Sequence, residues 1–286
     1  MLKTVVVAEL IFVIVLSAVT ITLKAAIFRK KSITSTWNQC PALCLLLISN
    51  ALLAVLGALF ATQWLLFALG LIENIPENSL FLTVVGRLFM ILQLFNHCSA
   101  VGLFAQRVYC LLYPAKIVTN FNYIILGILL IIFLCGSIMP IYSTITFTTP
   151  TGYPVPEGCF SFSCMKGYSS SVRLSLSAFS AAISTIVTVL GSYMVYLLYK
   201  RRKTRRSVLE KNKNNFASYV FVVRFIDQTI PFFADTILSA SMNVYLGNYL
   251  GPYGVIGAAT DYTIQTIVYY MIIRNHKRLT TVSTAT

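Results

Sequence analysis

Six of the ionisable side chains inside long apolar runs of the sequence are the groups best suited to bind a ligand or to act as a switch. They are Arg87, His97, Arg224, Asp227, Asp235 and Asp261. A charge at the centre of a membrane-spanning helix costs roughly 2.5 to 3.5 kcal/mol on insertion scales, so it is retained where it is paired or functional. Each of these side chains is therefore a candidate for pairing between helices or for function.

The segment from residue 224 to residue 231 combines two of these charges with a proline. Arg224 and Asp227 are three residues apart, which places both on one face of a helix. Pro231 lacks an N–H group and frees a backbone carbonyl, so it predicts a bend. Arg224 could pair with Asp227 or with Asp261 near the middle of the membrane. The pair could orient the helices, or it could be a lock that breaks on activation.

The other charges are expected closer to the outer mouth of the bundle, where a ligand would arrive. Arg87 and Asp235 form a second hypothetical pair between helices. We interpret Arg87, His97, Asp235 and Asp261 as the candidate ligand pocket. For His97 a hydrogen-bonded packing role is the alternative.

Catalytic and metal-binding motifs are missing from the sequence. It contains no HExxH, no GxSxG and no Gly-rich phosphate loop, and only two histidines occur, His97 and His276. We therefore expect no catalytic residues, no metal site and no cofactor, and we predict that the protein is not an enzyme.

Apolar helices that cross a membrane must position these side chains. Hydrophobic residues make up 57% of the chain and charged residues only 10%, and the mean hydropathy is +0.79. A soluble domain needs much more surface charge. A helix that spans a bilayer needs roughly 20 apolar residues. Runs of this length occur at about residues 5–28, 44–69, 80–106, 123–145, 172–199, 216–241 and 250–273.

The predicted fold is therefore all-α, a single integral membrane domain over residues 1–286 with seven transmembrane helices. Most of the 22 Lys and Arg residues lie in one set of alternate connections. This bias places that set in the cytosol, with the N-terminus outside and the C-terminus cytosolic. The net charge of +14 then reflects loops beside anionic membrane lipids, and no nucleic-acid partner is expected.

Two cysteines fall on the oxidising side in this topology. Cys159 and Cys164 lie in the connection between the fourth and fifth predicted helices. A disulfide between them is plausible in that compartment, and two free thiols are the alternative.

Three stretches carry a resemblance to a known family. They are QRVYCLLYP at 106–114, EGCFSFSC at 157–164 and NFASYVFVVRFIDQTIPFFADT at 215–236. With the predicted topology, the chain resembles a G-protein-coupled receptor and, more narrowly, a nematode serpentine chemoreceptor of class BC. It departs from rhodopsin-type receptors in having Gln106 before Arg107 and in lacking an Asn-Pro pair before Tyr269.

The resemblance implies a plasma-membrane receptor in sensory cilia that binds a small odorant or pheromone and signals through a heterotrimeric G protein. It implies that the sixth helix moves at Pro231 and opens a cleft beside Arg107, with Arg224 and Asp227 in the same activation machinery. A ligand-gated channel or small-solute transporter is the alternative. Association with itself or with a second chain stays open.

Overall fold

The protein is described by a computed structural model that covers residues 2–30, 33–114, 119–147, 155, 170–201, 208–242 and 253–283. Every regular element within these residues is a helix, so the all-α prediction is confirmed. The elements are α1 (Leu2–Lys30), α2 (Ile33–Gln39), α3 (Pro41–Leu69), α4 (Pro76–Leu112), α5 (Thr119–Phe147), α6 (Ser170–Lys200), α7 (Val208–Arg224), the π-helix η1 (Phe225–Thr229), α8 (Ile230–Met242) and α10 (Tyr253–Ser283).

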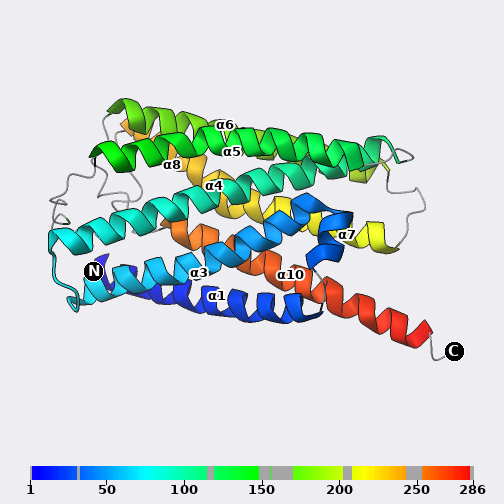
Figure 1. The fold of residues 1–286 in the computed structure, drawn as a ribbon, viewed down its shortest axis with the longest axis horizontal. Coiled ribbons are helices and arrows are strands. Elements are labelled where there is room, and N and C mark those ends of the chain that lie inside the picture. Colours follow the sequence, from blue (N-terminus) through cyan, green and yellow to red (C-terminus); the bar gives the residue numbers. More distant parts are fainter. Residues whose placement is uncertain are drawn as a thin grey trace.

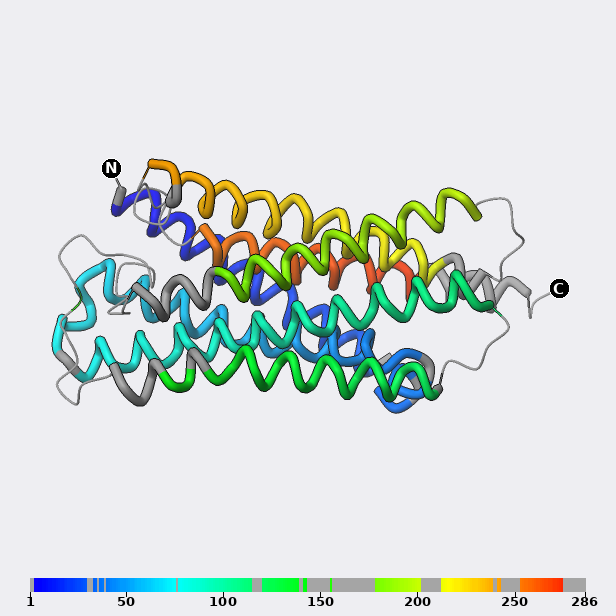
Figure 2. Tube along the Cα trace, turned by 90° about the horizontal axis from the view of Figure 1, so that it is seen from above, coloured from blue at the N-terminus to red at the C-terminus, as the bar shows by residue number. Residues whose placement is uncertain are grey.

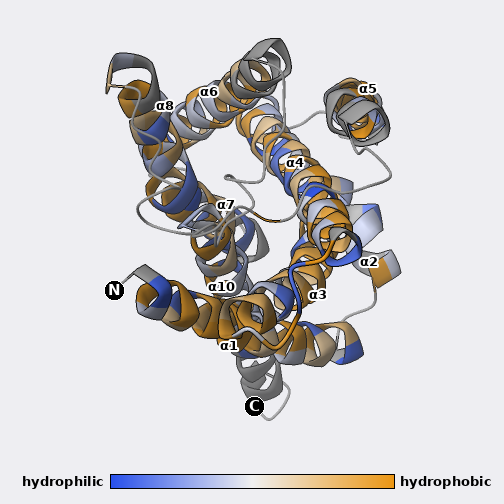
Figure 3. Ribbon diagram, turned by 90° about the vertical axis from the view of Figure 1, so that its left-hand side faces the viewer, coloured by the Kyte–Doolittle hydropathy of each residue, from blue (hydrophilic) through white to orange (hydrophobic). Residues whose placement is uncertain are grey.

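The long helices run along one common axis, with the two chain termini towards opposite ends (Figures 1 and 2). We call the end of the bundle that carries the N-terminus the N-terminal end. Seen from this end, the middle of the bundle is surrounded by α1, α3, α4, α6, α8 and α10 (Figure 3). α5 lies outside this ring against α4, and α10 packs on α1 and closes it.

Five helices are long and apolar enough to cross a membrane, within the residues that the structure describes. Their apolar ranges are Lys3–Arg29, Pro41–Leu69, Glu77–Leu112, Asn120–Ile138 and Ala178–Lys200. Large apolar side chains point outwards from these helices, such as Ile131 on α5, which is 63% exposed, and Val15 on α1, which is 53% exposed. Such a surface is unfavourable in water and suits a lipid environment. The architecture therefore fits a helical protein embedded in a membrane.

The predicted sixth and seventh spans fall on elements outside this group of five. The sixth range, 216–241, covers the end of α7, η1 and most of α8, and the seventh, 250–273, lies mostly on α10. Seven spans and their orientation therefore remain predictions.

Two apolar clusters fill the interior on either side of a polar layer. The cluster nearer the N-terminal end includes Leu53, Phe89 and Ala258, and the other includes Leu47 and Ala100. Between these positions in α3 and α4 lie the buried polar side chains of Ser49, Asn50 and Asn96, and the buried Asp261 of α10 belongs to the same layer. The polar side chains are therefore separated from both ends of the bundle by close-packed apolar groups.

Val155 belongs to the connection between α5 and α6 and lies buried at the N-terminal end. Its backbone N–H donates to Oδ1 of Asn74 at 2.8 Å, and its carbonyl accepts from Nδ2 of the same side chain at 2.8 Å. The side chain of Val155 is 3% exposed and packs in the nearer apolar cluster. The amide of Asn74 thus fixes one residue of this long connection to the turn between α3 and α4.

A π-helical turn interrupts the helix between α7 and α8 at the place where Pro231 predicts an irregularity. The N–H of Ile230 bonds to the carbonyl of Phe225, five residues back. Pro231 has no N–H to offer the carbonyl of Asp227, four residues back. That carbonyl instead faces Gly257 of α10, where a Cβ atom would collide with the oxygen. Gly257 therefore permits the close approach of α10 to η1.

Replacing Gly257 with alanine should separate α10 from η1. Because the clash is with a backbone oxygen, which cannot rotate away, we expect Gly257→Ala to lower the free energy of unfolding by about 1 to 3 kcal/mol. Thermal unfolding of the purified protein in detergent measures this change.

Gly127→Ala on α5 is the matched control, because a Cβ there meets no heavy atom within 4 Å in the described part of the chain. Alanine favours a helix over glycine, so this variant should be as stable as the parent or slightly more stable. Equal destabilisation by both variants would contradict the close contact at Gly257.

Candidate functional site

A buried ion pair joins α7 to α10 in the polar layer. Nη2 of Arg224 lies 3.2 Å from Oδ2 of Asp261, and each side chain is only 1% exposed. Of the two partners considered for Arg224, the structure therefore shows Asp261. Two ions so far from solvent are tolerated only if further hydrogen bonds satisfy their remaining donors and acceptors.

Asn96 and His97 of α4 supply acceptors for the guanidinium. Nη1 of Arg224 donates to the backbone carbonyl of Asn96 at 3.3 Å, and Nη2 donates to the side-chain oxygen Oδ1 of the same residue. Nδ1 of His97 lies 3.5 Å from Nη1. Arg224 thus binds α4 as well as α10.

Two glutamines supply donors for the carboxylate. Nε2 of Gln228, on η1, donates to Oδ2 of Asp261 at 2.8 Å. Nε2 of Gln265, one turn along α10, donates to Oδ1 at 2.5 Å. Both carboxylate oxygens therefore have a donor in addition to the arginine, as a buried charge requires.

Three uncharged side chains close the network through α3. Nδ2 of Asn50 donates to Oε1 of Gln265 at 2.9 Å. Nδ2 of Asn96 lies 2.6 Å from Oδ1 of Asn50 and 2.8 Å from Oγ of Ser49. A continuous set of hydrogen bonds therefore joins α3, α4, α7, η1 and α10. Removing one member affects the others, because partly satisfied buried networks are unstable.

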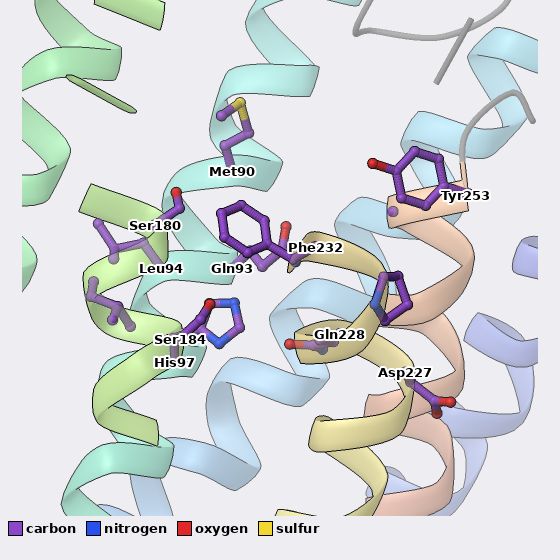
Figure 4. A pocket seen from close by; sticks show the side chains of 13 residues that line it. Met90, Gln93, Leu94, His97, Ser180, Ser184, Asp227, Gln228, Phe232 and Tyr253 are labelled. Carbon is purple, nitrogen blue, oxygen red and sulfur yellow. The ribbon is translucent and has the colours of Figure 1, made fainter. Parts of the chain in front are cut away.

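A pocket of about 210 Å³ lies next to this network, between α4, α6, η1–α8 and the start of α10. Figure 4 shows its lining side chains, among them His97 and Gln228. These two side chains contact Arg224 and Asp261 of the buried ion pair. The lining combines apolar side chains, neutral polar side chains and the acidic Asp227. The lining residues are Met90, Gln93, Leu94, His97, Ser180, Ile183, Ser184, Asp227, Gln228, Pro231, Phe232, Tyr253 and Gly254.

Five of the predicted site residues line the pocket or lie directly behind it. His97, Asp227 and Pro231 line the pocket, although Figure 4 shows the carboxylate of Asp227 directed away from His97. Asp261 and Arg224 lie behind the pocket and reach it through Gln228 and His97.

The second hypothetical pair involves two residues that are not among the pocket lining. Arg87 on α4 is 7% exposed. Asp235 on α8 interacts with the side chain of Tyr253, which does line the pocket. The pairing of Arg87 with Asp235 stays a prediction.

Arg107 lies near the far end of α4 and is 6% exposed. Its neighbour Gln106 donates from Nε2 to Oδ1 of Asn122 on α5 at 2.9 Å and accepts a hydrogen bond from Sγ of Cys40. The side-chain amide of Gln106 thus links α4 to α5 and to the start of α3. In rhodopsin-type receptors an acidic residue precedes the corresponding arginine. Cys159 and Cys164 lie outside the described residues, so their disulfide stays a prediction.

The uncharged members of the network were missed by the search for charges. Asn50, Asn96 and Gln265 are all 2% exposed or less. Amide side chains in apolar runs are also costly to bury without partners, so a search that included Asn and Gln would have found all three.

Comparison with protein-family models finds no match to this chain, and comparison with curated protein sequences finds none either. The resemblance to nematode chemoreceptors therefore stays a prediction, and the function has to be argued from the site itself.

Breaking the ion pair on one side should destabilise the fold strongly. Asp261→Leu leaves the guanidinium of Arg224 without its counter-charge, and such changes cost about 3 to 5 kcal/mol. Adding Arg224→Met removes the stranded charge, so the double variant should be less destabilised than the sum of the two single variants. Chemical unfolding in detergent, with surface delivery in cells as a second readout, measures the coupling.

Asp227→Leu is the control for removing an acidic residue, because Asp227 is only half-buried and donors to its carboxylate are not described. We expect this variant to change the free energy of unfolding by less than about 1 kcal/mol, because the charge is half-exposed. Strict additivity of Arg224→Met and Asp261→Leu would contradict the pairing.

Proposed function

We propose that the protein is a receptor of the plasma membrane that binds a small molecule between its helices and signals to a heterotrimeric G protein. In this proposal seven helices cross the membrane, with the N-terminus outside and the C-terminus in the cytosol. The observation that carries it is the contact between a ligand-sized pocket and a buried ion pair that joins several helices.

The pocket supports the ligand-binding part of the proposal. Its lining mixes apolar side chains with a few convergent polar groups, which is typical of sites for small organic molecules. Four separate parts of the chain contribute to it, so an occupant contacts helices that are distant in sequence.

The arrangement around η1 supports the signalling part. The same short segment carries the pocket residue Gln228, the start of a proline-containing helix and a direct contact with α10. π-Helical turns and prolines are common points of helix movement. A ligand that binds one arrangement of η1 more tightly than another would shift the equilibrium between them. α7 extends from this segment towards the end opposite the N-terminus (Figure 1). Arg107 lies near the C-terminal end of α4.

The interior supports a receptor more than a channel. Charged residues inside a membrane also occur in ion and substrate pathways. Here Arg224 and Asp261 are paired with each other and enclosed by amides, and apolar clusters border the layer on both sides.

Filling the pocket should abolish responses to ligand. Ser184→Trp places the largest side chain among the lining residues, so we expect at least a roughly tenfold loss of apparent affinity, equivalent to about 1.4 kcal/mol. The readout is cyclic nucleotide, calcium and membrane current in cells that display the protein, tested with a panel of small molecules.

Thr185→Trp is the matched control. Thr185 follows Ser184 on α6, and its side chain is exposed and lies outside the pocket. This variant should respond as the parent does. If Ser184→Trp responds equally well, the pocket is not the ligand site.

Blocking G proteins distinguishes the receptor from the channel. We expect both the block and Arg107→Ala to abolish the responses while surface delivery persists. A ligand-gated current that survives both would contradict G-protein signalling and favour the channel.

A further inference from the structure

The side-chain amide of Gln228 donates a hydrogen bond through its nitrogen, but its oxygen has no hydrogen-bond partner among the described residues. Nε2 donates to Oδ2 of Asp261 at 2.8 Å. The carboxylate of a buried ion pair accepts hydrogen bonds, so this contact fixes which end of the amide faces Asp261. Oε1 must point the other way, and it is buried without a hydrogen-bond partner among the described residues.

Figure 4 shows this oxygen directed into the pocket, towards the side occupied by His97. Buried acceptors are nearly always satisfied in folded proteins, and an exception at the wall of a cavity marks a place where a ligand or a water donates. The pocket therefore presents a fixed acceptor.

His97 supplies a donor to the same pocket. Its Nδ1 lies 3.5 Å from Nη1 of Arg224, and a guanidinium can only donate. Nδ1 is thus the acceptor, and the proton of the neutral ring is on Nε2. The structure describes no other hydrogen bond of His97, so this N–H remains available to an occupant.

The full charges near the pocket do not face the place where Gln228 and His97 meet. Arg224 and Asp261 neutralise each other, and the carboxylate of Asp227 is directed away from His97. A charged ligand would have to lose its hydration without gaining a counter-ion on the side of the cavity where Gln228 and His97 meet. A neutral ligand has no such penalty.

We infer that the pocket binds a neutral alcohol-type molecule, whose hydroxyl donates to Oε1 of Gln228 and accepts from Nε2–H of His97. Its apolar part packs against Met90, Leu94, Ile183 and Phe232. This inference rests on the proposed receptor function and adds the ligand class and a specificity residue. Gln228 is also the positioning residue that connects the occupant to Asp261.

Four probes of similar size test this ligand class. They are octanol, its isomer heptyl methyl ether, octylamine and octanoate. Binding to the purified full-length protein in lipid nanodiscs is measured as a concentration-dependent shift in Tm. The ether can accept a hydrogen bond from His97 but cannot donate to Gln228. We therefore expect octanol to bind about three- to tenfold more tightly than the ether and more tightly than either charged probe.

Two glutamine variants assign the preference to one side chain. Gln228→Leu should bind octanol and the ether equally. Gln63→Leu is the matched control, because Oε1 of Gln63 is also buried without a hydrogen-bond partner in the described part of the chain, but the residue lies outside the pocket. It should keep the preference for octanol. Probe that dissolves in the lipid of the nanodisc affects the Tm of the parent protein and of both variants alike. It therefore does not alter the comparison between them.

The outcomes separate the inference from the proposed function. Equal binding of octanol and ether by the parent protein overturns the inference, whether or not Gln228→Leu folds, and leaves the pocket as a ligand site. Tightest binding of octylamine or octanoate also overturns it. An octanol preference that persists in Ser184→Trp places the probe elsewhere and contradicts both the inference and the proposed pocket. No shift with any probe contradicts the hydroxyl preference.

Discussion

The guanidinium of Arg224 is the group on which the interior of this protein depends. A charge with 1% exposure, placed among apolar helices, cannot be stable without a counter-charge and further acceptors. Asp261 provides the counter-charge, and Asn96 provides two oxygens. Satisfying Asp261 in turn requires Gln228 and Gln265. The need to satisfy one buried cation therefore fixes the mutual positions of several helices.

The same requirement explains why an irregular segment is tolerated beside the pocket. Pro231 and the π-helical turn loosen the backbone hydrogen bonding just after Arg224, and the network and the contact with Gly257 hold that segment in place. Its lining residue Gln228 contacts Asp261 directly. An occupant of the pocket thus acts on the least regular part of the interior, and the ion pair lies one hydrogen bond away.

Sequence patterns predicted the parts of this arrangement that follow from local composition. Apolar runs gave the helices, and Pro231 indicated an irregularity because a missing N–H is readable from one residue. The choice between Asp227 and Asp261 was not readable, because α-helical spacing does not apply once η1 begins directly after Arg224. The partners of Gln106 and Asn96 could not be predicted, because they come from other helices at distances in sequence that a local pattern does not contain.

We infer that the ion pair keeps α7 in its position in the bundle. The distance between α7 and α5 tests this most directly. Spin labels introduced as unnatural amino acids at Tyr219 on α7 and Tyr123 on α5, both exposed, report this distance by electron double resonance in nanodiscs. Asp261→Asn removes the charge with almost no change in volume. We predict a broader and shifted distance distribution in this variant, because the guanidinium has lost its counter-charge. A distribution identical to that of the parent would show that α7 is held in place without the ion pair.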